Sequence, residues 1–315
     1  MEQVWVCGLD YTKVFNIKYW YSNLDHSVGV ALIVWNFTHN KKQTLAGLFH
    51  DIATPTFKHC IDFMNGDYET QESTEERTEQ IIRNSKEIMS LLKRDDIKVE
   101  EVADYHIYPI ADNNTPQLSA DRFEYNFSSG LVFHRVWELD KIQEIYNHIV
   151  ILKNEDGIQE LGFDDYKICE KYIHIVSKLW PEWISDKDRT CMQFYADIVK
   201  SMNIKGYLAV DDLYNLSESQ IIDKIKNCDD EYLKDSFTKF QNATVDSTYG
   251  SNTPVKNKYC ISVKSKRRYI IPLTEYNGKV CRINTISEQA QNDIDEYFNI
   301  KHYKYTGFDF DFKPY

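Results

Sequence analysis

Residues 25–39 read DHSVGVALIVWNFTH, and this stretch decides the fold. Apolar residues occupy nearly every side of the helix that it predicts, which is typical of a helix in the middle of a bundle. The next stretch, residues 42–51 (KQTLAGLFHD), predicts a second helix, because apolar side chains recur at helical spacing up to Phe49. Pro55 then breaks the helix, since the residue before a proline disfavours the helical conformation. We therefore expect a helical core in this part of the chain.

The remaining sequence predicts a mainly α protein that ends in a small α/β piece. Its 315 residues include only 11 glycines and 7 prolines, so few residues interrupt regular structure. Strand-like runs appear only late in the chain, at residues 259–263, 269–273 and 279–283, after a turn-rich linker. A last helix is expected at about 287–298. We divide the chain into a core domain (1–135), a helical extension (136–240), and a linker with a small α/β C-terminal subdomain (241–315).

Charge and cysteine usage restrict the class of protein. The chain carries 37 Lys and Arg against 49 Asp and Glu, a net charge of −12, so we expect no general nucleic-acid binding. Its seven cysteines include no C-x-x-C pair, which favours a reducing compartment. The longest apolar stretch, residues 28–37, is far shorter than the ~20 residues of a membrane span. With no signal peptide recognisable, we expect a cytoplasmic protein that does not cross a membrane.

Four polar residues on predicted helices form a candidate metal site. His50 and Asp51 are adjacent at the end of one helix, His26 lies at the start of a buried helix, and Asp121 opens a third helix. Two imidazoles and two carboxylates suit one Mn, Fe, Mg, Zn, Co or Ni ion and leave positions for water and substrate. From spacing alone, four unrelated caps and core polar groups are the favoured alternative, because a His-Asp dipeptide is common.

Three separated motifs alter that balance, because together they resemble HD-domain phosphohydrolases, and best of all the deoxynucleoside triphosphate triphosphohydrolases. Residues 22–30 (SNLDHSVGV) resemble their S-R-F-E-H-S-x-G-V segment, and residues 50–59 (HDIATPTFKH) resemble their H-D-x-x-H-x-P-F-x-H run. Residues 119–125 (SADRFEY) are similar to A-D-R-x-D-Y. Residues 264–272 (KSKRRYIIP) are similar to a K-x-R-Y-I-x-P strand of that subgroup. The order of the motifs agrees as well as their spacing.

The resemblance implies a role for each matching residue and an HD-domain helical bundle as the fold. The implied ligands of one divalent metal ion are His26, His50, Asp51 and Asp121. His59 and Asp62 match catalytic positions beside the metal. The candidate substrate-binding residues are Asn23, which stands where the relatives carry an arginine, and Lys58 and Arg122, which lie next to motif positions.

The departures from the pattern concern the substrate. Thr54 stands where the triphosphohydrolases have a histidine, and Asn23 offers weaker donors to phosphate than an arginine. A further His-Glu of those enzymes corresponds here to Thr74-Glu75 or to Gln71-Glu72. Metal binding is therefore better supported than triphosphate hydrolysis, and we expect only weak activity on triphosphates.

The predicted function is a metal-dependent phosphohydrolase that acts on a nucleotide or another phosphate ester, such as a nucleoside monophosphate. The alternative is a catalytically weakened HD-fold protein that binds nucleotides in a regulatory role. A homo-oligomer is a further possible assembly of this chain. The basic run at 264–268 (KSKRR) is predicted on a β-hairpin, where it would contact an anion or another subunit; a solvated hairpin is its alternative.

Overall fold

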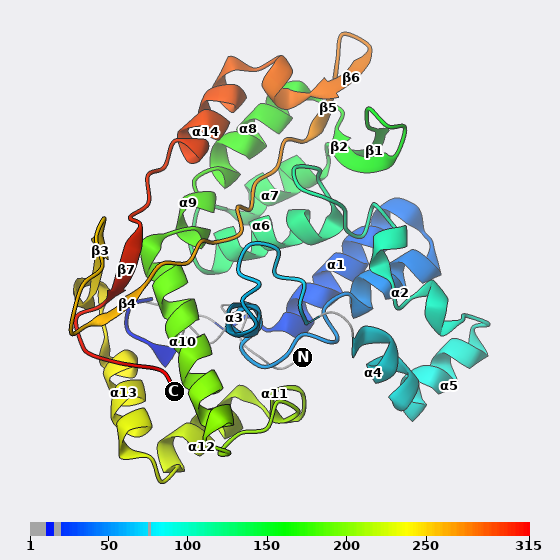
Figure 1. The fold of residues 1–315 in the computed structure, drawn as a ribbon. Coiled ribbons are helices and arrows are strands. Elements are labelled where there is room, and N and C mark those ends of the chain that lie inside the picture. Colours follow the sequence, from blue (N-terminus) through cyan, green and yellow to red (C-terminus); the bar gives the residue numbers. More distant parts are fainter. Residues whose placement is uncertain (1–10, 16–19, 75–76) are drawn as a thin grey trace.

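The computed structural model describes residues 11–15, 20–74 and 77–315, and their fold is mainly α-helical (Figure 1). The helices of the first half are α1 (Asn23–Thr38), α2 (Lys41–Phe49), α3 (His59–Met64), α4 (Thr78–Asn84), α5 (Lys86–Arg94), α6 (Ala120–Val132) and α7 (Leu139–Tyr146), with 3-10 turns η3 (Val99–Glu101) and η4 (Tyr105–Ile107). The later helices are α8 (Tyr166–Val176), α9 (Trp180–Trp183), α10 (Asp186–Ile204), α11 (Asp212–Asn215), α12 (Glu218–Asn227), α13 (Glu231–Asn242) and α14 (Glu288–Phe298), with η5 (Val245–Ser247) and η6 (Ile283–Thr285). The predicted fold class is confirmed.

Two small sheets accompany the helices. One contains β1 (Ile149–Lys153), β2 (Gln159–Phe163), β5 (Leu273–Tyr276) and β6 (Lys279–Arg282) in the order β1-β2-β5-β6. Its central pair, β2 and β5, is parallel, with Gly162 opposite Leu273, and the outer pairs are antiparallel. The other sheet has the order β3-β7-β4 and consists of β3 (Thr248–Ser251), β4 (Tyr259–Ile261) and β7 (Tyr305–Phe308). Both sheets join segments that are distant in sequence.

Three expectations about strands are wrong, one of them the strand predicted at 269–273, of which only Leu273 lies in a strand. The β1–β2 hairpin lies inside the predicted helical extension, where no strand was expected. The basic run 264–268 is not on a hairpin: residues 262–272 form an extended connection between β4 and β5 with no strand of their own (Figure 1). The backbone of this connection forms hydrogen bonds with loops: the Ile271 amide donates to the Pro116 carbonyl at 2.7 Å. Such pairing with a loop is invisible to a local sequence pattern.

The expectation that α1 is buried on nearly all sides is also wrong. Val30 and Val34 are buried, but one stripe of apolar side chains on the helix faces solvent: Leu24, Val28, Leu32 and Trp35. The mean apolarity of the segment is high on both faces, so its periodicity could not show which face the bundle covers.

Two large clusters of buried side chains organise the molecule. One joins α1 and α6 with α8 and α14, and the other joins α3 with α10, α12 and α13 and the β3-β7-β4 sheet. Residues of the predicted C-terminal subdomain, such as Ile270 and Ile294, thus share a core with α1. The predicted domain boundaries stay a prediction. None of the described helices is long and apolar enough to span a membrane.

Candidate metal centre

Helix α1 supplies His26 from its first turn. Ser22 caps the helix by accepting a hydrogen bond from the Asp25 amide, and the Asp25 side chain completes a capping box. One turn further, α1 crosses α6 closely at Gly29, where an added Cβ would lie 2.8 Å from Cγ of Glu124. The glycine of the H-S-x-G motif is therefore needed for space, since it lets the Glu124 carboxylate approach His26.

Glu124 orients the His26 ring. The Nδ1 atom of His26 binds the Glu124 carboxylate, which also accepts hydrogen bonds from the Tyr21 hydroxyl at 2.5 Å and from Ser128 at 3.2 Å. With Nδ1 donating, Nε2 carries the lone pair that a metal ion requires. Glu124 was not among the residues predicted from the sequence, although it stands at the second acidic position of the A-D-R-x-D-Y motif.

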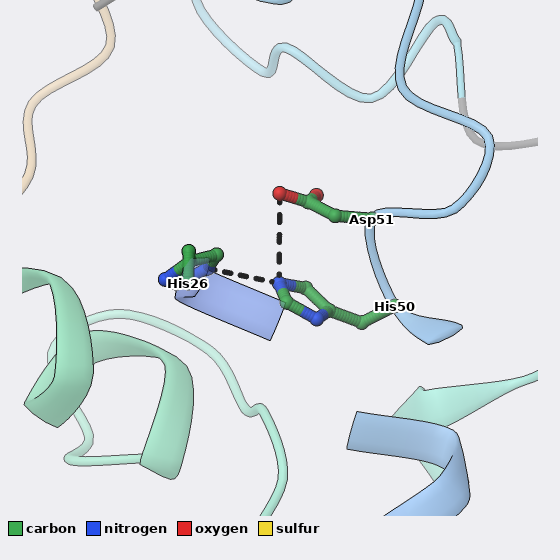
Figure 2. Close-up of side chains that lie close together, drawn as sticks. All are labelled: His26, His50 and Asp51. Carbon is green, nitrogen blue, oxygen red and sulfur yellow. Dashed lines mark hydrogen bonds and ion pairs between the residues drawn. The ribbon is translucent and has the colours of Figure 1, made fainter. Parts of the chain in front are cut away.

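His50 and Asp51 follow directly at the end of α2. Nδ1 of His50 donates to the Gly47 carbonyl at 2.7 Å, so Nε2 faces the centre. There it lies 3.1 Å from Nε2 of His26 and 3.7 Å from Oδ2 of Asp51 (Figure 2). Figure 2 shows His26 approaching from one segment of the backbone, and His50 and Asp51 approaching from the consecutive residues of another.

Asp121, in the first turn of α6, completes the group. Its Oδ1 atom lies 3.0 Å from Nε2 of His26 and 3.5 Å from Nε2 of His50. The structure thus brings all four sequence-predicted ligands together. Both imidazoles are buried, whereas the side chains of Asp51 and Asp121 are 23% and 20% exposed, so solvent reaches the centre from the carboxylate side.

The donor set fits a divalent cation. Neighbouring ligand atoms about 2.1 Å from one ion lie about 3.0–3.4 Å apart in octahedral or tetrahedral arrangements. The two Nε2 atoms lie 3.1 Å apart, and the carboxylate oxygens beside them lie at 3.0–3.7 Å. Two imidazole lone pairs that face each other at 3.1 Å repel unless a cation or a proton lies between them. Nitrogen and carboxylate ligands together suit the first-row transition ions.

The pKa shifts of His26, His50 and Asp51 also show that this group stabilises positive charge. Burial by itself lowers the pKa of both histidines, but Glu124 beside His26 and Asp51 beside His50 outweigh it, so both pKa values are raised. Burial opposes ionisation of Asp51, yet Lys58 and the two histidines hold its pKa well below its usual range. The centre is thus a strongly coupled acid–base cluster in which positive charge is stabilised.

Lys58 reaches the metal centre through an unusual backbone. Phe57 and Lys58 both have positive φ angles, 69° and 46°, which non-glycine residues adopt rarely. Phe57 is fully buried against Tyr195, and this anchor turns Lys58 inward. The Lys58 ammonium lies 3.1 Å from Oδ2 of Asp51 and also donates to Oδ1 of Asn23. Asn23 matches a position at which the triphosphohydrolases carry an arginine, and here it accepts a hydrogen bond from another cation.

His59 and Asp62 form a second hydrogen-bonded unit in the first turn of α3. Nδ1 of His59 donates to Oδ2 of Asp62 at 3.0 Å, and Ser73 donates to the other carboxylate oxygen at 2.7 Å. Asp62 is buried, whereas the His59 side chain is 33% exposed. Burial lowers the pKa of His59, Asp62 opposes this, and Arg268 and Lys58 reinforce it, so the net shift is downward. A neutral, accessible imidazole can accept a proton near pH 7.

Arg268, from the basic run, contacts His59 directly. Its Nη2 atom donates to Nε2 of His59 at 3.1 Å and to Oε1 of Gln71 at 2.5 Å. Gln71 belongs to one of the two segments that could match the family's further His-Glu; in the other, Glu75 lies outside the described residues. The basic run is visible in the sequence, but no local pattern predicts this contact, because 209 residues separate the two partners.

Arg122 serves the loop before α6. Its guanidinium donates to Asp112 at 3.0 Å and to Asn113 at 2.7 Å, and it also bonds Ser119. Most of its donors therefore hold this loop against the helix that carries Asp121. A role for Arg122 in substrate binding stays a prediction.

The chain resembles solved structures over nearly its whole length. A phosphohydrolase from Bacteroides thetaiotaomicron VPI-5482 superposes with a TM-score of 0.64, covering 97% of this chain and 90% of that protein at 13% identity. A hypothetical protein from Aquifex aeolicus gives a TM-score of 0.60 over 95% and 89% of the two chains, at 12% identity. These likenesses establish a shared fold.

Sequence comparison adds one distant relative. The uncharacterized protein YdhJ of Bacillus subtilis (strain 168) is 25% identical over 137 residues, which are 43% of this chain and 41% of that protein. The similarity thus spans less than half the length of the relative. The chain matches no protein-family profile.

Proposed function

We propose that this chain is a metal-dependent phosphohydrolase of the HD superfamily that acts on a nucleotide or another small phosphate ester. The single observation that carries the proposal is the cluster of His26, His50 and Asp51, whose ligand atoms lie within 4.8 Å of one another. Asp121 joins it through contacts of 3.0 and 3.5 Å with the two histidines. A fold shared with a phosphohydrolase agrees with it. When bound, a divalent ion would supply Lewis-acid activation of water and neutralise charge on a phosphoryl oxygen.

The chain's own residues supply the other functions of such a site. In this proposal Lys58, a buried cation beside Asp51, binds an oxygen of the scissile phosphate. His59 takes up or gives a proton at Nε2, and Asp62 holds the ring through Nδ1. The partly exposed carboxylates leave an approach for the substrate from solvent.

The test is incubation of protein loaded in turn with Mn, Fe, Mg, Zn, Co or Ni with a panel of nucleotides and phosphomonoesters, followed by chromatography of the products. Release of triphosphate, or of inorganic phosphate from a monophosphate, would support the proposal and identify the reaction. No product with any metal, together with tight nucleotide binding, would instead favour the regulatory alternative. An Asp121→Asn variant serves as the control, since any activity from this site requires that ligand.

A further inference from the structure

Arg268 occupies the atom of His59 that proton transfer would use. Because Nδ1 of His59 donates to Asp62, its Nε2 atom carries the lone pair, and this lone pair accepts the hydrogen bond from Arg268. Nη2 of Arg268 donates its two hydrogens to His59 and Gln71. In this state the candidate base is covered.

The rest of the guanidinium is available to a ligand. Within the part of the chain that the structure describes, Nε and Nη1 of Arg268 make no hydrogen bond. The same holds for Nζ of Lys266, two residues away and partly buried. Asp188, whose charge Arg268 feels, does not neutralise this pair at pH 7, because burial and Glu182 raise its pKa to about 8. Glu72 and Asp112 act on Lys266 through charge, but within the described residues neither makes a hydrogen bond to Nζ of Lys266 or to Nε or Nη1 of Arg268. Donor atoms of both cations are therefore free to bind an anion.

The backbone that carries Arg268 is held at both ends. Val263 accepts a hydrogen bond from Arg189 of α10, and Ile271 donates to the Pro116 carbonyl. The extended connection crosses the front of the molecule between these anchors (Figure 1). A change of partner by Arg268 therefore requires only side-chain rotation, not movement of a loop.

We propose that Arg268 is a phosphate ligand that covers His59 until substrate arrives. A phosphate group draws the guanidinium away, because the charge-assisted bond to phosphate is stronger than the bond to a neutral imidazole. Nε2 of His59 is then free to exchange a proton. The inference rests on the proposed function, since it gives His59 a task in phosphate chemistry, and it makes Arg268 a link between phosphate binding and release of the base.

The test follows the His59 ring by 15N NMR in protein loaded with one equivalent of Zn²⁺, with inorganic phosphate as the probe and His59→Gln to assign the resonance. In the wild type, phosphate should shift the Nε2 resonance as its hydrogen bond to Arg268 is lost. In Arg268→Gln the phosphate-induced shift should disappear and the Kd for phosphate should rise about tenfold or more. Arg268→Lys keeps the charge and should give an intermediate Kd.

The matched control is Arg267→Gln. Arg267 is the neighbouring exposed cation, and it packs on Phe298 and donates to the Phe298 carbonyl, away from His59. It should leave both the shift and the Kd unchanged. An unshifted wild-type Nε2 resonance at saturating phosphate, or an Arg268→Gln Kd equal to that of the wild type, would overturn the inference. Either result in a protein that hydrolyses phosphate esters would overturn the role of Arg268 and leave the proposed function intact. A phosphate-induced shift in a protein that hydrolyses no substrate would overturn the proposed function alone.

Discussion

The ammonium group of Lys58 lies 3.1 Å from Oδ2 of Asp51, so a buried cation stands directly beside a candidate metal ligand. In Lys58→Met the loss of this charge should raise KM about tenfold or more, because a charge-assisted bond to phosphate is removed. The metal content should stay near that of the wild type, since Lys58 repels a cation. Steady-state kinetics and metal analysis separate the two effects. Lys42→Met, which removes a lysine paired with Glu101, is the matched control and should leave KM unchanged.

Asn23→Arg tests whether position 23 takes part in binding the phosphate. From the resemblance to the triphosphohydrolases alone, an arginine at this position would be expected to raise activity. Asn23 is fully buried and accepts a hydrogen bond from Lys58, so an arginine would crowd the core and face a like charge. We expect a loss of stability of about 1–3 kcal/mol and no gain in kcat/KM. A thermal unfolding curve unchanged from the wild type, with faster turnover, would contradict this packing argument.

Gly29→Ala should weaken the metal centre without touching a ligand. The new Cβ would lie 2.8 Å from Cγ of Glu124 and displace the carboxylate that orients His26. Loss of such an orienting partner typically weakens metal affinity about 10–100-fold. Glu124→Gln should show a loss of the same size, measured by competition with a chromophoric chelator. Leu32→Ala, which changes an exposed side chain on the same helix, is the matched control and should leave the metal affinity unchanged.

The pH profile should report on His59. Burial lowers the pKa of His59 from the ordinary value of 6.5. Asp62 raises this pKa and Arg268 lowers it, and the net shift is downward. A lowered pKa keeps the base neutral to lower pH, so the acidic limb of kcat/KM should lie below pH 6.5. Asp62→Asn removes the group that raises the pKa and should move the limb to still lower pH. Arg268→Gln should move it to higher pH. Shifts in the same direction for both variants would exclude His59 as the titrating group.

The residues of the candidate metal centre could be predicted from the sequence, but its surroundings could not. The four proposed ligands lie in three short motifs, so residues such as His50 and Asp51 could be named from local patterns. The Arg268–His59 contact depends on how the 262–272 connection crosses the molecule, and no local pattern encodes that path. The same holds for β2 and β5, which pair in parallel although more than 100 residues separate them.

Other errors had local causes. The β1–β2 hairpin turns at Gly157, which has a φ of 76°, but its strands contain Glu160 and Gly162, residues that weaken a strand pattern. Glu160 is buried and pairs with Arg282, a partner that lies 122 residues away and makes its burial tolerable. A sequence pattern cannot foresee such a partner.

The most direct test of the account is the metal content of the purified wild type and of Asp51→Asn, measured after incubation with each of the six ions and removal of excess. We predict about one divalent ion per chain in the wild type and a severalfold loss of occupancy in the variant, because one of four ligands loses its charge. His106→Asn, which changes an exposed histidine outside the centre, should bind as the wild type does. A wild type that holds none of the six ions, or an Asp51→Asn variant with full occupancy, would contradict the assignment of His26, His50, Asp51 and Asp121 as a metal centre.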